Sequence, residues 1–315
     1  MYYVNLSSQL SRKICMDRVV EQLRLLGEQL DRQVFPQVWG GGIVRPSEPA
    51  AQSEPMGKGN KDVGERTARK SPRPASRQTA ARSWEAGTRT PIVRSSSQRA
   101  YERQLKAVCT VYPGSQFWNQ AEGHWLLVQS ALLEDCDRKA LFAIAIPREH
   151  RCQIQSWGFW SDQDDVTWIG PRHTNFPDGS ICAFHVEDET WQIGDPLLTL
   201  VDLYTVWAIR HLHLKLLGRW PGSQYARWLY ERLIETQPDE LCGCGSLEKR
   251  YSECCQPLDV KANRVAAAMR YNAETRGARR EVPMKVLEFA RTKRDPPQVS
   301  GYFMEPDKGH RIRAA

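Results

Sequence analysis

The feature that most constrains this chain is a long stretch, residues 40–97, that is poor in large apolar side chains. It opens with three consecutive glycines and is then dominated by Pro, Ser, Arg, Ala and Gly, with Trp84 as an isolated large residue. Such a stretch cannot bury enough surface to offset the conformational entropy that folding would cost. The sequence therefore predicts a disordered linker here, preceded by an N-terminal helix within residues 1–39.

The same linker carries most of the positive charge of the protein. Between Lys58 and Arg103 there are twelve Lys or Arg against four Asp or Glu, whereas the net charge of the whole chain is +7. The remainder is thus close to neutral, which argues against a folded nucleic-acid-binding domain. A solvated linker is the simpler interpretation, and weak electrostatic contact with nucleic acid is the alternative.

The hydrophobic core is expected in the middle of the chain, because nine of the eleven Trp lie between Trp118 and Trp228. The apolar run Leu141 to Ile146 is short and bounded by charges and a proline, which favours a strand buried on both faces. Sequential strands with short connections indicate a four-stranded antiparallel meander with flanking helices, an α+β fold. We expect strands at 124–133, 139–147, 152–159 and 166–169, and helices at 8–34, 99–109, 197–217 and 225–236.

Neither a membrane span nor secretion is indicated. The chain has no run of 18 apolar residues, and its richest segment, 197–217, contains Asp202, Arg210 and Lys215. Charged groups at bilayer depth cost about 2–3 kcal/mol each. The start of the chain lacks the features of a secretory signal. The nine cysteines, an odd number, therefore suggest reduced thiols and a cytoplasmic protein.

Four cysteines crowd into fourteen residues, which is the spacing of a metal site. Four thiolates favour zinc in a closed, tetrahedral, structural site with no open position for catalysis. A redox pair is the competing interpretation, but Cys-x-Cys followed by adjacent cysteines is unusual for one. The segment resembles the SEC-C motif, a zinc knuckle, with Gly243 in place of its proline, and this implies a docking module at 239–257. The expected ligands are Cys242, Cys244, Cys254 and Cys255.

A second candidate site lies in the loop that ends at Cys182. Its Pro-Asp-Gly turn would present Cys182 from a fixed edge, and a nucleophilic thiol needs access and fixed geometry. His173 and Asn175 can fold back to support that edge. The Asn175 amide could donate to a developing oxyanion or could simply pin the loop. A small buried cysteine without chemistry is the alternative.

The order of elements around this loop resembles that of the ubiquitin-conjugating enzymes. In that family a helix and a four-stranded meander precede a His-Pro-Asn loop, an Asn/Asp-Gly-Ser-Ile-Cys segment, a Trp and a long helix. The turn after the helix resembles that of the bacterial branch found in antiphage conjugation operons. The matching residues here are His173-Thr174-Asn175, Asp178-Gly179-Ser180-Ile181-Cys182, Trp191, the helix at 197–217 and Gly218-Arg219-Trp220-Pro221-Gly222.

The resemblance implies a ubiquitin-conjugating-enzyme-like domain at 98–238 and a helical tail at 258–315. Cys182 would accept a ubiquitin-like modifier from an activating enzyme and pass it to an amine of a protein acceptor, with His173 and Asn175 as site residues. The acidic residues at 187–189 are candidates for orienting the amine, and His185 for a base. The alternative is a non-catalytic zinc-binding adaptor whose conjugating-enzyme-like core only binds.

Overall fold

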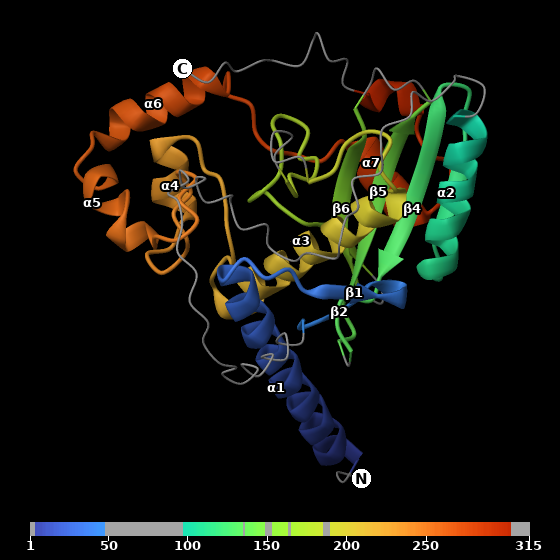
Figure 1. Ribbon diagram of the computed structural model, residues 1–315, viewed down its shortest axis with the longest axis horizontal. Helices are drawn as coiled ribbons and strands as arrows, with labels where there is room; N and C mark the ends of the chain where they lie inside the picture. The colour runs from blue at the N-terminus through green and yellow to red at the C-terminus, as the bar shows by residue number, and fades with distance from the viewer. Residues whose placement is uncertain are drawn as a thin grey trace, which may run out of the picture.

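The computed structural model describes residues 4–47, 97–134, 136–148, 153–162, 165–184 and 190–303. Residues 4–14 and 97–100 are described by their backbone alone. Most of the basic linker lies outside the described residues, and with it the choice between a solvated linker and weak contact with nucleic acid. In chain order (Figure 1), the elements are α1 (Val4–Asp31), β1 (Gln37–Trp39), β2 (Ile43–Arg45), α2 (Ser97–Val111), β3 (Gln116–Asn119), β4 (Gly123–Ser130), β5 (Lys139–Pro147), β6 (Gln155–Ser161), β7 (Val166–Trp168), α3 (Leu197–Leu217), α4 (Leu229–Glu235), α5 (Gln256–Asp259), α6 (Arg264–Glu274) and α7 (Met284–Thr292).

The centre of the fold is one antiparallel sheet with strand order β3-β4-β5-β6-β7. The α+β class and the meander are therefore confirmed. The prediction of four strands is wrong, because β3 adds a fifth strand ahead of the others. This strand is only four residues long and shows no alternation of buried and exposed side chains, so the sequence gives no periodic signal for it.

Both faces of the sheet are buried, as the apolar run in β5 predicted. Every residue of β5 after Lys139 is buried. Successive side chains point to opposite faces, so Phe142, Ile144 and Ile146 join one core cluster. Leu141 and Ala143 join the other.

The first face is covered by α2 and α3, and α1 packs on α3. In α1, Leu23 and Leu26 are fully buried in the first core cluster, so this helix packs on its own chain. The structure confirms the predicted span of α3, which ends at Gly218 in the left-handed conformation. Figure 1 shows α3 running across the sheet. Among the described helices, none is long and apolar enough to cross a bilayer.

The second face is covered by the C-terminal segment, which corrects the prediction of a tail after residue 258. Val286, Phe289 and Ala290 of α7 and Val299 beyond it are buried against the sheet. The Phe289 ring meets Trp125 edge-on at 5.3 Å between centroids. Residues 284–303 therefore complete the hydrophobic core.

The linker does not begin at Gly40 as predicted. Residues 40–42 form a 3₁₀ turn, and β1 and β2 pair across it. Gly42 has φ +78°, and a Cβ there would lie 2.1 Å from the Ser130 hydroxyl. The glycines thus allow a tight turn that packs closely against the sheet. From the sequence alone, the same glycines were interpreted as the start of a flexible linker.

The segment after α3 also differs from the prediction. The helix expected at 225–236 begins only at Leu229, because Tyr225 and Ala226 are extended and pair with Cys244 and Gly243. In Figure 1, α4, α5 and α6 gather away from the sheet, beyond the end of α3. They form a lobe that contains the cysteine cluster.

Gly158 of β6 tests the packing of α3 on the sheet. A Cβ at this position would lie 2.6 Å from the Trp207 ring, so Gly158→Ala should lower the free energy of unfolding by about 1–3 kcal/mol. The control is Gly301→Ala, since a Cβ there meets nothing within 4 Å, and we expect a change below about 0.5 kcal/mol. Equal effects of the two variants in denaturant unfolding would contradict this packing.

Candidate functional site

The loop that carries Cys182 is a tight hairpin fixed to the edge of the sheet. Thr174 pairs with Ile181 in an antiparallel bridge, and the Cys182 amide donates to the His173 carbonyl at 3.1 Å. The Ile181 amide donates to the Ser156 carbonyl of β6 at 2.7 Å. Gly179 has φ +64°, as the Pro-Asp-Gly turn predicted. The thiol-bearing residue is thus displayed from a fixed backbone.

Asn175 pins this hairpin. Its Nδ2 donates to the Ser180 hydroxyl at 3.2 Å and to the Ile181 carbonyl at 3.1 Å. Of the two roles that the sequence left open for the amide, the geometry favours support of the loop. Asn175 therefore acts on Cys182 through the backbone.

Cys182 is partly exposed and lines a small pocket of about 50 Å³. A space of this size admits one or a few groups as large as water. The walls come from four segments that are far apart in the sequence. These are the Cys182 hairpin, the extended residues before α4, α4 itself and the segment after α6. The other lining residues are His173, Thr174, Gln224, Tyr225, Ala226, Glu231, Glu235, Thr236 and Arg280.

His173 lies in this pocket wall as a neutral, half-buried ring. It stacks on Trp220 with centroids 3.8 Å apart. Burial, together with the neighbouring Arg172 charge, holds the pKa of His173 well below its ordinary value. Within the described part of the chain, its buried Nε2 has no hydrogen-bond partner. The same holds for the Thr236 hydroxyl and for Arg280 Nε, so three residues that line the pocket each have a buried polar atom without a partner among the described residues.

The pocket also contains two carboxylates that sequence reasoning missed. Arg280 forms ion pairs with Glu231 and, at 3.1 Å, with Glu235. Burial, and the nearby Glu231 charge, raise the pKa of Glu235 despite the guanidinium. The two carboxylates share one guanidinium, and Arg172 also lies close enough to Glu235 to lower its pKa. The acidic candidates at 187–189 and His185 lie outside the described residues.

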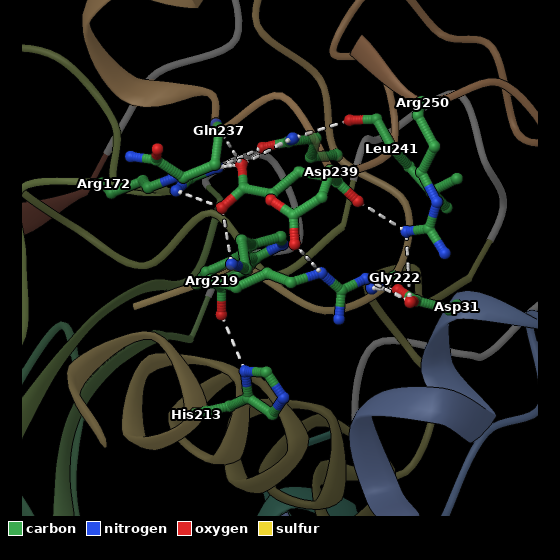
Figure 2. Close-up of polar contacts among 12 residues, drawn as sticks. Asp31, Arg172, His213, Arg219, Gly222, Gln237, Asp239, Leu241 and Arg250 are labelled. Carbon is green, nitrogen blue, oxygen red and sulfur yellow. Dashed lines mark hydrogen bonds and ion pairs between the residues drawn. The ribbon is translucent and has the colours of Figure 1, made fainter. Parts of the chain in front are cut away.

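Next to this pocket, a buried carboxylate joins several segments. Glu240 is fully buried and accepts from both terminal nitrogens of Arg172, from the Trp220 amide at 2.6 Å and from the Gln237 amide at 3.1 Å. Figure 2 shows Arg172 and Gln237 in this network. Gln224 Nε2 also donates to Glu240, at 3.2 Å.

The same network reaches the end of α1. The Asp31 carboxylate pairs with Arg219, accepts from the Gly222 amide at 2.8 Å and accepts from Arg250 at 3.2 Å (Figure 2). Arg219 also pairs with Asp239 at 3.3 Å. The N-terminal helix is therefore tied to the turn after α3 and to the hairpin between the cysteines.

The four cysteines of the second predicted site do come together. The sulfur atoms of Cys242, Cys244, Cys254 and Cys255 all lie within 4.8 Å of one another, and they could bind a metal ion. Cys244 and Cys254 are 3.7 Å apart, and Cys254 and Cys255 are 3.9 Å apart. The Cys242 amide donates to the Lys249 carbonyl at 2.9 Å, which closes a short hairpin between the ligand pairs.

No family model matches this sequence, and it matches neither a curated protein nor a solved structure. The functional assignment therefore depends on the residues of the two sites.

A buried histidine beside the first site predicts acid sensitivity. His211 packs against Trp207 and Trp220, and burial together with the Arg172 charge lowers its pKa to about 3. The unfolded chain protonates it near pH 6.5, so its contribution is complete above that pH and is lost as the pH falls towards 3. Between these limits it should account for about 1.4 kcal/mol of unfolding free energy per pH unit. Denaturant unfolding from pH 7 to 5 should show a shallower pH dependence for His211→Gln, and an unchanged dependence would contradict a neutral buried ring.

Proposed function

We propose that this chain is a conjugating enzyme for a ubiquitin-like protein, which it carries as a thioester on Cys182. The observation that carries the proposal is the partly exposed Cys182 beside a pocket with unpartnered polar atoms. The resemblance in the Cys182 loop and the antiparallel meander ahead of α3 support it as well.

The chemistry has two steps that conserve atoms and charge. The Cys182 sulfur attacks the thioester carbonyl of a charged activating enzyme, the old C–S bond breaks, and the departing thiolate takes up the proton that Cys182 loses. An amine of a protein acceptor then attacks the new thioester, an amide bond forms, and Cys182 leaves as the thiol. Thioester exchange is close to thermoneutral, so positioning of the two partners is the main requirement.

The pocket beside Cys182 has the chemistry to receive the amine. Three lining residues, His173, Thr236 and Glu235, carry atoms of the type that accepts a hydrogen bond from an N–H group, and of these the imidazole Nε2 and the hydroxyl are buried in the pocket wall. Glu231 and Glu235 share the guanidinium of Arg280, and carboxylate oxygens of this kind can also bind a cationic amine. A carboxyl with a raised pKa is also suited to take up the proton released during attack.

The alternative is a non-catalytic adaptor. Buried polar groups without partners cost free energy, about 1–3 kcal/mol each, and a core that only binds other proteins through its surface has no use for them. Of the eight such atoms among the described residues, three belong to residues that line the pocket with the Cys182 thiol, and these are His173 Nε2, the Thr236 hydroxyl and Arg280 Nε. That combination favours the enzyme.

We also propose that the four cysteines hold zinc. A tetrahedral zinc with Zn–S distances of about 2.3 Å places its sulfurs about 3.8 Å apart. The separations of 3.7 and 3.9 Å at Cys254 fit this geometry. Four thiolates leave no open position, so the metal would have a structural role and would supply folding free energy to the lobe.

Metal analysis tests the zinc site. The purified protein should contain about one zinc per chain, and Cys242→Ser or Cys254→Ser should remove most of it. The matched control is Cys109→Ser, which removes a half-buried thiol from α2 and should leave the zinc content unchanged. Zinc that is absent from the wild type, or retained by both ligand variants, would contradict the site.

A synthetic peptide thioester that ends in Gly-Gly tests the carrier thiol. We expect an acyl adduct that is cleaved by excess thiol, maps to Cys182 and is absent from Cys182→Ser. Cys109 and Cys136, which are also partly exposed, serve as internal controls because burial raises their pKa values. An adduct spread equally over these cysteines, or none at Cys182, would support the adaptor.

The loaded protein then tests the amine pocket separately. Glu235→Gln and Thr236→Val should load normally, but free lysine should discharge their adduct at least about tenfold more slowly than in the wild type. Hydrolysis of the adduct without lysine is the reference rate. Loss of both reactions to the same extent would indicate a damaged loop.

A further inference from the structure

The four-cysteine site and the Cys182 loop are joined by hydrogen bonds at two places. We infer that the zinc site holds Cys182 in position, and that Glu240 is the positioning residue between them. The inference rests on the zinc proposed above. It does not require the acyl transfer proposed for Cys182, because it concerns only the geometry and protection of that thiol.

The first connection passes through Glu240, two residues before the ligand Cys242. Its carboxylate binds both terminal nitrogens of Arg172, with 3.0 Å to Nη1. Arg172 precedes His173 in the chain, and the His173 carbonyl accepts from the Cys182 amide at 3.1 Å and from Trp207 Nε1 at 3.0 Å. Figure 2 shows Arg172 reaching into this network. If Glu240 moved, Arg172 would lose its partner, and the neighbouring His173 carbonyl that holds the Cys182 amide would be free to shift.

The second connection does not pass through the Glu240 carboxylate. The Gly243 carbonyl, between two ligands, accepts from the Ala226 amide at 2.7 Å. The ligand Cys244 pairs with Tyr225 in an antiparallel bridge. Ala226 and Tyr225 line the pocket together with Cys182. The backbone of the metal loop thus supports one wall of the pocket.

The segment between the ligand pairs has little apolar burial to hold it without the metal. Leu247 is 51% exposed, and Cys244 is also exposed, although Tyr251 is buried at the far end of the hairpin. In such short metal-binding segments, the free energy of metal binding is folding free energy. Removal of the metal should release the Gly243 carbonyl and loosen the backbone next to Glu240.

The buried ion pair between Glu240 and Arg172 limits the motion of both side chains in the first connection. The side chains are 0% and 9% exposed, and each ion of a buried pair depends on the other for compensation. The Trp220 amide also donates to Glu240, and the Trp220 ring stacks on His173. Glu240 is therefore tied to the Cys182 loop by an ion pair and by a ring contact.

The test measures alkylation of Cys182 by iodoacetamide in the full-length protein. The peptide that contains Cys182 is quantified by mass spectrometry, with zinc bound and after removal of zinc by a chelator. We expect zinc removal to increase the rate at Cys182 on the order of tenfold, because local opening exposes the thiol. The rate at Cys109, on α2 and outside the lobe, should not change. An unchanged rate at Cys182 would overturn the inference, whereas failure of the zinc proposal itself would appear as protein without zinc.

Variants at full zinc occupancy isolate Glu240. Glu240→Gln should increase the Cys182 rate while the zinc content is retained, and adding Arg172→Gln should restore it partly, because the unpaired cation is removed. The matched control is Asp239→Asn, since this neighbouring carboxylate is 68% exposed and pairs with Arg219. We expect the wild-type rate for it. An equal increase in the control, or no increase in Glu240→Gln, would overturn the role of Glu240. If Glu240→Gln does not fold, the inference is judged on the wild type, by the alkylation rate of Cys182 with zinc bound and after its removal.

Discussion

A carboxylate that no solvent reaches, Glu240, is the constraint on which the functional part of this protein depends. A buried charge is tolerated only when it is paired and its lone pairs are satisfied. Arg172, Gln224 and two backbone amides provide this, and they come from the Cys182 loop and from both sides of α4. The carboxylate therefore fixes the relative position of segments that share no sheet. Without this carboxylate, fewer hydrogen bonds would connect the pocket wall to the hairpin that carries the cysteines.

The sheet holds the Cys182 loop at its edge, but the other walls of the pocket come from segments outside the sheet. Its two buried faces divide the chain into helices that cover one side and a C-terminal segment that covers the other. Between these, the segment from the end of α6 to α7 passes the pocket and contributes Arg280. The residues after the cysteine cluster therefore belong both to the core and to the candidate site, and a domain boundary at residue 258 would separate them from the sheet and the pocket that they contact.

The unpartnered polar atoms around Cys182 lower the stability of the fold, and such a cost is typical of a functional site. Most buried polar groups in proteins are satisfied, and three of the eight exceptions among the described residues, at His173, Thr236 and Arg280, belong to the wall of one small pocket beside a thiol. Local violations of otherwise consistent packing are expected at functional sites. The neutral state of His173, held by burial, keeps an acceptor in the pocket wall where a charged ring would repel an amine.

The sequence by itself determined the features that rest on local pattern. The apolar richness of residues 197–217 favoured the helix α3, the short apolar run predicted β5 as buried on both faces, and the spacing of four cysteines predicted that their sulfurs would meet. Only the tertiary structure decided that Glu231, Glu235 and Arg280 surround Cys182 and that Glu240 joins it to the cysteine cluster. These contacts link segments separated by tens of residues, and each residue alone resembles an ordinary surface charge. Their environment arises only when the sheet and the helices bring the segments together, because burial and pairing are properties of the packed chain.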